Sequence, residues 1–140
     1  MYRRILVGLD GSEGSRRALD CALDLAELTG AALHALSVEE HLPAFAGTVG
    51  EVQDAQRFAN QYFRGIHEEA AALAARRGRA LTHEIVPGHV AQTLMRVARE
   101  GGFDLIILGH AGHSALAHLF LGSTADRVVE HAQCAVLIVR

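Results

Sequence analysis

The chain has 140 residues, of which half are hydrophobic and 21% are charged, a balance that predicts one folded domain over residues 1–140 and excludes a disordered chain. The formal net charge is −3 and the sequence has no block of basic residues, so nucleic acid is not an expected partner. All thirteen basic residues are arginine, which excludes chemistry that needs a lysine amine, such as a Schiff base or a lysine-containing phosphate loop.

Five short apolar segments predict β-strands. They span residues 4–9, 32–38, 80–86, 104–109 and 135–139. Their apolar residues are largely continuous rather than alternating, which is typical of strands that are covered on both faces.

Helical spacing marks the segments between these strands. One buried face of a first helix, which ends at Gly30, is predicted from Ala18, Cys21, Ala22, Leu25 and Leu28. Further helices are predicted over residues 58–75, from residue 90 to the glycines at 101 and 102, and over residues 123–131. Strands that alternate with helices predict an α/β fold, with an open parallel sheet and helices on both of its faces.

One connection breaks this regular pattern. Residues 39–54 contain Pro43, Gly47 and Gly50, and the segment is long for a connection of this kind, which typically has about 2–6 residues. We expect an irregular, mobile flap over the strand ends.

The N-terminus and the cysteines indicate where in the cell the protein is expected. Residues 1–4 lead directly into the first strand, without the long apolar region of a secretory signal. Nor does any apolar stretch reach the length of a membrane span. Cys21 and Cys134 each fall within an apolar pattern and are expected to be buried thiols. We therefore expect a cytoplasmic protein that does not enter a membrane.

Glycine-rich segments follow the first and fourth strands, GLDGS at residues 8–12 and GHAG at residues 109–112. In an open parallel sheet, ligands bind beyond the carboxyl ends of the strands, where the strand order reverses. Small residues there let the backbone turn sharply and let a phosphate approach it. The spacing of Gly8, Gly11 and Gly14 is GxxGxxG rather than the dinucleotide pattern GxGxxG, so this partial match is weak.

A more informative spacing is Gly109-x-x-Gly112, nine residues, then Gly122-Ser123-Thr124. Its second half opens the last predicted helix, where unpaired N–H groups, the helix dipole and two hydroxyl groups could hold a phosphate. A glycine turn followed by an ordinary serine cap explains the same residues equally well, and the spacing leaves both alternatives open.

Three segments in the same order resemble the universal stress protein family. RILVGLDGSEGSRRAL at residues 4–19 is similar to the family's first strand and helix, and residues 86–109 are similar to its third-to-fourth-strand segment. Residues 109–139 carry a G-x2-G-x9-G-[ST] motif ahead of the last helix and strand. The resemblance runs nearly end to end and is weakest over residues 39–57.

The resemblance implies a Rossmann-like, adenine nucleotide alpha hydrolase-like sheet of order 3-2-1-4-5, and a homodimer paired along residues 135–139. It also implies binding of ATP, with Mg²⁺ as an accompanying cation, in the branch that keeps the glycine motif. The site positions that the resemblance carries over are Gly8, Leu9, Asp10, Val38, Leu108, Gly109, Gly112, His113, Gly122, Ser123 and Thr124.

These positions have different implied roles. Asp10 helps to hold the nucleotide, and the backbone near Val38 meets the adenine. Leu108, Gly109 and Gly112 line the path of the ribose and phosphates. The segment from Gly122 to Thr124 holds the phosphates. A helix cap is a second interpretation of Asp10, compatible with the first.

His113 departs from the family pattern, which has Arg or Lys after the second motif glycine. A neutral imidazole supplies no fixed positive charge, so this change lowers nucleotide affinity or makes it dependent on pH. Together with His110 and His118 it forms a cluster whose spacing matches no standard zinc pattern, and we expect no metal site there.

The resulting hypothesis is a nucleotide-binding stress-response or signalling module that acts through partner proteins. The alternatives are a slow ATPase or nucleotide hydrolase, and a family member with weak or no nucleotide binding. Hydrolysis needs a base and charge neutralisation. Asp10 or a histidine could be the base, but the chain has neither lysine nor the family's basic residue at position 113.

Overall fold

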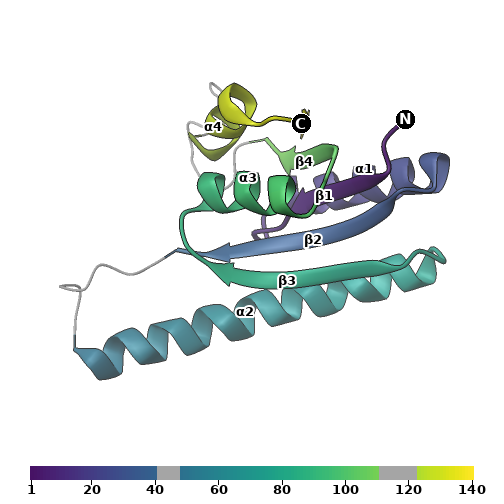
Figure 1. Ribbon diagram of the computed structural model, residues 1–140. Coiled ribbons are helices and arrows are strands. Elements are labelled where there is room, and N and C mark those ends of the chain that lie inside the picture. The colour runs from purple at the N-terminus through teal and green to yellow at the C-terminus, as the bar shows by residue number, and fades with distance from the viewer. Residues whose placement is uncertain (41–47, 111–122) are drawn as a thin grey trace.

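The computed structural model describes residues 1–40, 48–110 and 123–140. The strands are β1 (Arg4–Gly8), β2 (Ala32–Glu39), β3 (Leu81–Pro87), β4 (Leu105–Gly109) and β5 (Ala135–Val139). The helices that alternate with them are α1 (Glu13–Thr29), α2 (Val49–Arg76), α3 (Val90–Glu100) and α4 (Ser123–His131), as Figure 1 shows. Each predicted strand is present, with ends that agree to within one residue.

The sheet has the order β3-β2-β1-β4-β5, and its neighbouring strands are all parallel. This confirms the expected α/β fold and strand order. In the central strand, Val7 lies opposite Ala35 of β2 on one side and Ile107 of β4 on the other. The chain adds β2 and β3 on the first side of β1, then β4 and β5 on the second, so the strand order reverses between β1 and β4.

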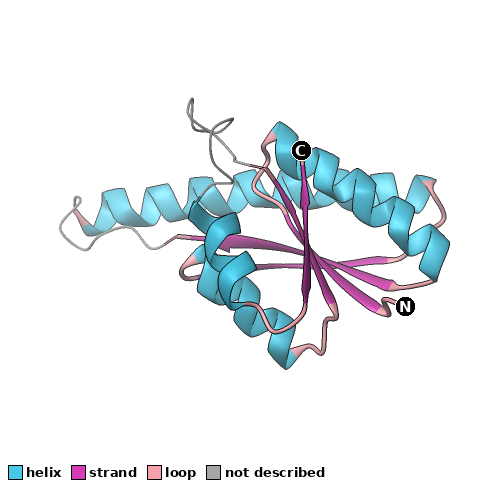
Figure 2. Ribbon diagram, turned by 90° about the horizontal axis from the view of Figure 1, so that it is seen from above, coloured by secondary structure: helices cyan, strands magenta, loops and turns pink. Residues whose placement is uncertain are grey.

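Helices cover both faces of the sheet (Figure 2). Alternate residues of the central strand face opposite layers: Ile5 and Val7 pack with α1 and α2, whereas Leu6 packs with α3 and α4. All three are fully buried, which explains why the central strands are continuously apolar. The edge strand β3 differs, since Thr82 and Glu84 are exposed.

The face that α1 buries is not the predicted one. Ala18 and Ala22 are fully buried as expected, but Leu28 is 83% exposed. The remaining contact with the sheet is made by the neighbouring stripe that contains Leu19, Leu23 and Ala26. Two apolar stripes overlap on this helix, and helical periodicity alone does not choose between them.

The two cysteines are less buried than predicted. Cys21 and Cys134 are free thiols, and both are partly buried rather than fully enclosed. Burial is the main cause that raises the pKa of each thiol, and nearby Asp24 and Asp104 respectively add to it. Both therefore favour the protonated, unreactive form.

Helix α2 begins at Val49, well before residue 58, so the prediction of irregular structure through residue 54 was wrong. A capping box fixes this start: Thr48 Oγ1 accepts from the Glu51 N–H at 3.1 Å, and Glu51 Oε2 accepts from the Thr48 N–H at 3.3 Å. The T-x-x-E spacing signals this start despite the neighbouring glycines. Residues 41–47, to which the rest of the flap prediction refers, lie outside the described residues.

Helix α2 has 28 residues, which makes it about 42 Å long. Its N-terminal end extends past the sheet, as Figure 1 shows. Among the described parts of the chain, no helix combines the length and the hydropathy that crossing a membrane requires.

Candidate functional site

The carboxyl ends of β1 and β4 lie side by side where the strand order reverses. Helix α1 starts directly against them. A Cβ atom built on Gly14, in the first turn of α1, would lie 3.1 Å from the His110 carbonyl oxygen and 3.7 Å from the Gly109 Cα. The fold therefore brings Gly8, Asp10 and Gly109 to one edge of the sheet, which is where ligands of this class of fold bind.

Asp10 is exposed, and its backbone is held on both sides. The peptide group that joins Leu9 to Asp10 accepts at its carbonyl from Ser37 Oγ, at 2.5 Å. The N–H of the same peptide group donates to Ser15 Oγ, at 3.4 Å. The Asp10 carboxylate accepts from the Ser12 N–H, at 2.9 Å. These contacts fix the direction in which Asp10 presents its carboxylate to solvent.

The cap of α1 is Ser12, not Asp10. Ser12 Oγ accepts from the Ser15 N–H at 3.1 Å. Asp10 instead closes the turn that precedes the helix, in which Gly11 has a φ of +84°. A Cβ at Gly11 would lie 2.8 Å from Ile66 Cδ1, so its glycine is required by both backbone conformation and packing.

Gly8 and Gly109 are also explained by contacts within the protein. A Cβ on Gly8 would come within 2.7 Å of Leu108 Cδ2. A Cβ on Gly109 would overlap the backbone of Gly14 and lie 2.7 Å from the Ser15 nitrogen. Gly109 is therefore needed for packing, independently of any need for a ligand to approach, whereas at Gly8 the end of the Leu108 side chain would have to move.

The predicted site residues with apolar side chains are buried in the core. Leu9 is 5%, Leu108 6% and Val38 9% exposed. Leu9 packs toward α1 and α2, whereas Leu108 and Val38 pack toward α3 and α4. Their backbone, rather than their side chains, is what they can offer a ligand at the strand ends.

The phosphate half of the predicted site lies partly outside the described residues, with Gly112, His113 and Gly122. Ser123 and Thr124 are described: they are the first residues of α4, with Ser123 exposed and Thr124 half-buried. The N-terminal turn of α4 has the N–H groups and dipole that favour an anion. Within the described residues, no three His, Cys, Asp or Glu side chains converge as metal ligands.

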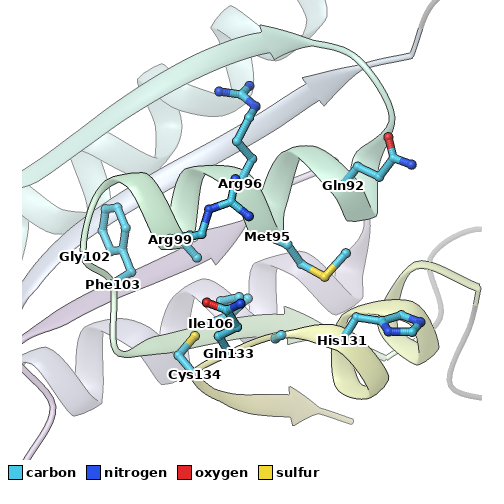
Figure 3. Close-up of a pocket in the computed structure, with 12 residues that line it drawn as sticks. Gln92, Met95, Arg96, Arg99, Gly102, Phe103, Ile106, His131, Gln133 and Cys134 are labelled. Atoms are coloured by element: carbon cyan, nitrogen blue, oxygen red, sulfur yellow. The ribbon is translucent and has the colours of Figure 1, made fainter.

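A separate cavity of about 590 Å³ lies along the face of the sheet that α3 covers (Figure 3). It lies between α3 and the segment that joins α4 to β5, with Phe103 and Ile106 among its apolar lining and Arg96 and Arg99 among its polar lining. None of the predicted site residues lines it. We therefore place the candidate site at the carboxyl end of the sheet and not in this cavity.

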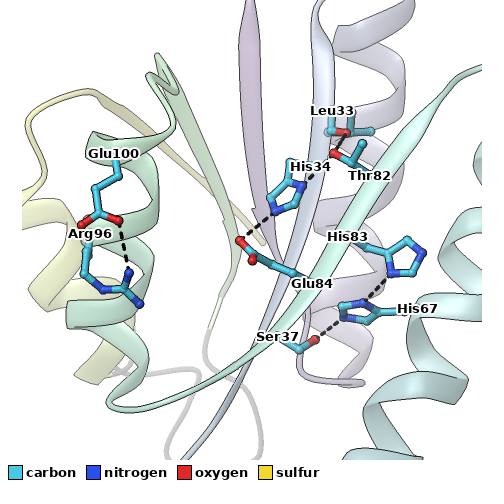
Figure 4. A network of polar contacts seen from close by, with 9 residues as sticks. All are labelled: Leu33, His34, Ser37, His67, Thr82, His83, Glu84, Arg96 and Glu100. Carbon is cyan, nitrogen blue, oxygen red and sulfur yellow. Dashed lines mark hydrogen bonds and ion pairs between the residues drawn. The ribbon is translucent and has the colours of Figure 1, made fainter.

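The sequence did not predict that two buried polar residues, Ser37 and His67, would support the site. Each is 1% exposed. Ser37 Oγ lies 2.7 Å from His67 Nε2, and His67 Nδ1 lies 3.2 Å from Nδ1 of His83 (Figure 4). Burial lowers the pKa of His67 to about 4, with further lowering from His83 and His34, so the ring is neutral at physiological pH. A polar residue inside the apolar strand was the available signal for Ser37.

Comparison with known proteins agrees with the resemblance seen in the sequence. Residues 1–140 match the model of the universal stress protein family. Universal stress protein YxiE of Bacillus subtilis is 31% identical over 148 residues, and the match covers all of both chains.

Solved structures resemble the fold as well. Universal stress protein UspA from Lactobacillus plantarum has a TM-score of 0.89 at 27% identity, with 99% of this chain and 98% of that chain covered. A universal stress protein crystallised in complex with cAMP has a TM-score of 0.73 at 28% identity, with 99% and 97% covered.

Proposed function

The chain belongs to the universal stress protein family, and we propose on this basis that it binds ATP or a related adenine nucleotide at the carboxyl ends of β1 and β4. The observation that carries the proposal is the exposed Asp10 carboxylate, held by Ser12 at the reversal of strand order. A relative with a similar fold binds cAMP, which supports an adenine nucleotide as the ligand class.

Each part of the site suits one part of such a nucleotide. A carboxylate such as Asp10 accepts hydrogen bonds from ribose hydroxyl groups. The backbone near Val38, with Gly8 and Leu9, suits the adenine side. Leu108, Gly109 and Gly112 continue the path toward the phosphates. The anion-binding end is the start of α4, with Gly122, Ser123 and Thr124, and His113 adds charge when protonated. Mg²⁺ bound with ATP would neutralise part of the phosphate charge.

We propose a single-domain binding module rather than an ATPase. Phosphoryl transfer needs charge neutralisation, and the chain has neither a lysine nor the family's basic residue at position 113, where it has His113. Nucleotide binding would alter its interactions with partner proteins in a stress response.

Two free thiols, Cys21 and Cys134, are consistent with the proposed cytoplasmic location, where thiols stay reduced.

Binding of ATP is expected to raise the melting temperature of the protein. A ligand at 100 times its Kd stabilises the native state by about 2.7 kcal/mol. Gly122→Val should abolish the rise. Asp10→Asn should weaken ATP by at least about tenfold, since it removes charge from a hydrogen-bond acceptor while keeping an oxygen for the Ser12 N–H.

The measurement is thermal unfolding with Mg²⁺ and increasing ATP. Asp54→Asn is the matched control, because Asp54 is also exposed and lies on α2, where its ion pair is with Arg57 and not with the turn. No rise for the unsubstituted protein at millimolar ATP would refute the proposal.

We also propose that two copies pair along residues 135–139. Strand β5 is an edge of the sheet, with β4 as its neighbour, and its Leu137 is 36% exposed. An apolar edge strand invites pairing with another chain. Leu137→Arg is therefore expected to convert a dimer to a monomer in sedimentation experiments, whereas Leu28→Arg, on exposed α1 surface, should leave the dimer intact. A monomeric unsubstituted protein at tens of micromolar would contradict this.

A further inference from the structure

A buried polar chain runs from the surface of β3 to the backbone of the candidate site. It consists of His83 on β3, His67 on α2 and Ser37 on β2, which Figure 4 shows in a row, and it ends at the Leu9 carbonyl. Burying a hydroxyl and an imidazole costs free energy unless both are hydrogen-bonded, and apolar residues would fill the same space without that cost. Their contacts therefore point to a role beyond filling the core.

The contacts fix where the protons lie. A carbonyl oxygen only accepts, so Ser37 donates its one hydroxyl proton to Leu9. The Ser37 oxygen is then the acceptor for His67, which must carry its proton on Nε2. The Nδ1 atom of neutral His67 is left as an acceptor, and His83 donates to it from its own Nδ1.

This chain of donors ends on the peptide group that carries Asp10. Ser37 holds its carbonyl and Ser15 holds its N–H. The two contacts approach the same planar unit from opposite sides, and that unit sets the direction of the Asp10 Cα–Cβ bond. Loss of the Ser37 contact would leave the peptide group held by the longer Ser15 contact, so it would tilt and the Asp10 carboxylate would move with it.

We propose that Ser37 and His67 are positioning residues for the nucleotide site, which hold the Leu9–Asp10 peptide group in its binding orientation until His67 is protonated. The inference rests on the proposed function, because it assigns a regulation to that site. Nucleotide binding and neutral His67 favour each other, so in acidic solution, where part of the protein carries a protonated His67, binding is coupled to release of that proton.

The surroundings of His67 explain why protonation would release the peptide group. The titratable groups that act on its ring are two imidazoles, His83 from β3 and His34 from β2. The His34 ring is itself hydrogen-bonded to Thr82 and Glu84. Both imidazoles disfavour a positive charge on His67. A cationic His67 that is 1% exposed is therefore driven toward solvent and away from Ser37.

The test measures the Kd of ATP with Mg²⁺ by calorimetry in Ser37→Ala, His67→Gln and the unsubstituted protein. The measurements run from pH 7.5 to pH 3.5, a range that includes the pKa of His67 at about 4. Ser37→Ala is expected to weaken binding by about tenfold at pH 7.5. The control Ile5→Val removes a methyl group from the far end of β1, where Ile5 is fully buried, and should change the Kd by less than about twofold.

His67→Gln keeps an N–H donor for Ser37 but does not titrate. We expect its Kd at pH 7.5 to stay close to that of the unsubstituted protein, and its loss of affinity on acidification to be smaller. Titration of the ATP phosphates affects both proteins equally, so the difference between their pH profiles reports His67. Identical profiles, or a Ser37→Ala protein that binds like Ile5→Val, would overturn the proposal.

A second readout needs no nucleotide. In NMR spectra of the free protein, the Asp10 amide signal should shift as His67 titrates, and the shift should be smaller in His67→Gln, where only the other titrating groups act on it. An Asp10 signal that does not follow His67 would overturn the positioning role. Failure of the unsubstituted protein to bind ATP would instead refute the proposed function, while the Asp10 signal would still decide whether His67 controls this peptide group.

Discussion

Replacing Gly109 by alanine is expected to lower the free energy of unfolding by about 3 kcal/mol, even without nucleotide. The added Cβ would overlap the Gly14 backbone and lie 2.7 Å from the Ser15 nitrogen. These atoms belong to the first turn of α1 and cannot rotate away as a side chain could. Either α1 or the end of β4 must shift, and both are packed in the core.

Gly65→Ala is the matched control, because it makes the same chemical change inside α2 where nothing lies within 4 Å of the new Cβ. It should stabilise the protein by about 0.5–1 kcal/mol, since alanine is the better helix former. Urea unfolding of both variants measures the difference. If Gly109→Ala keeps full stability and loses only ATP affinity, Gly109 serves ligand approach rather than packing.

This distinction affects how the glycine motif is interpreted. Gly109 is the first glycine of the G-x2-G-x9-G-[ST] spacing, and the family resemblance implies that it lines the ribose and phosphate path. Its contact with Gly14 joins β4 to the start of α1. The same contact brings the end of β4 close to the turn that presents Asp10. Packing and ligand approach are therefore compatible demands on one residue.

The fold was largely predictable because its central strands are buried on both faces. Leu6 and Ile106, for example, belong to continuous apolar segments that are typical of a parallel sheet covered on both faces. The start of α2 was missed because Gly47 and Gly50 outweighed the capping box of Thr48 and Glu51. Glycine composition signals a turn only on average, whereas a capping box has a defined hydrogen-bond pattern.

The candidate site was only partly predictable. Asp10 follows a central strand, so its place at the sheet edge follows from topology. The pairing of Ser37 with His67 does not follow from topology, because His67 is 30 residues away in the sequence and belongs to a different element. Such a pair depends on how α2 packs across β2 and β3, and local sequence patterns do not specify that packing.

The buried His67 also links stability to pH. Its pKa is lowered to about 4 in the native state, compared with about 6.5 in an unfolded chain. Between these values the unfolded chain binds a proton that the native protein does not, so stability rises with pH. The contribution of neutral His67 is therefore complete above pH 6.5 and is lost as the pH falls toward 4.

Acidification from pH 6.5 to pH 4 is accordingly expected to destabilise the protein by about 3 kcal/mol through His67 alone. His67→Gln should remove this part of the pH dependence, because its amide keeps a donor for Ser37 without titrating. Urea unfolding at several pH values measures the slope for both proteins. Other acidic and basic groups contribute equally to each, so the difference isolates His67. Equal slopes between pH 6.5 and pH 4.5 would show that His67 is protonated as readily in the native protein as in the unfolded chain, which its burial between β2 and α2 opposes.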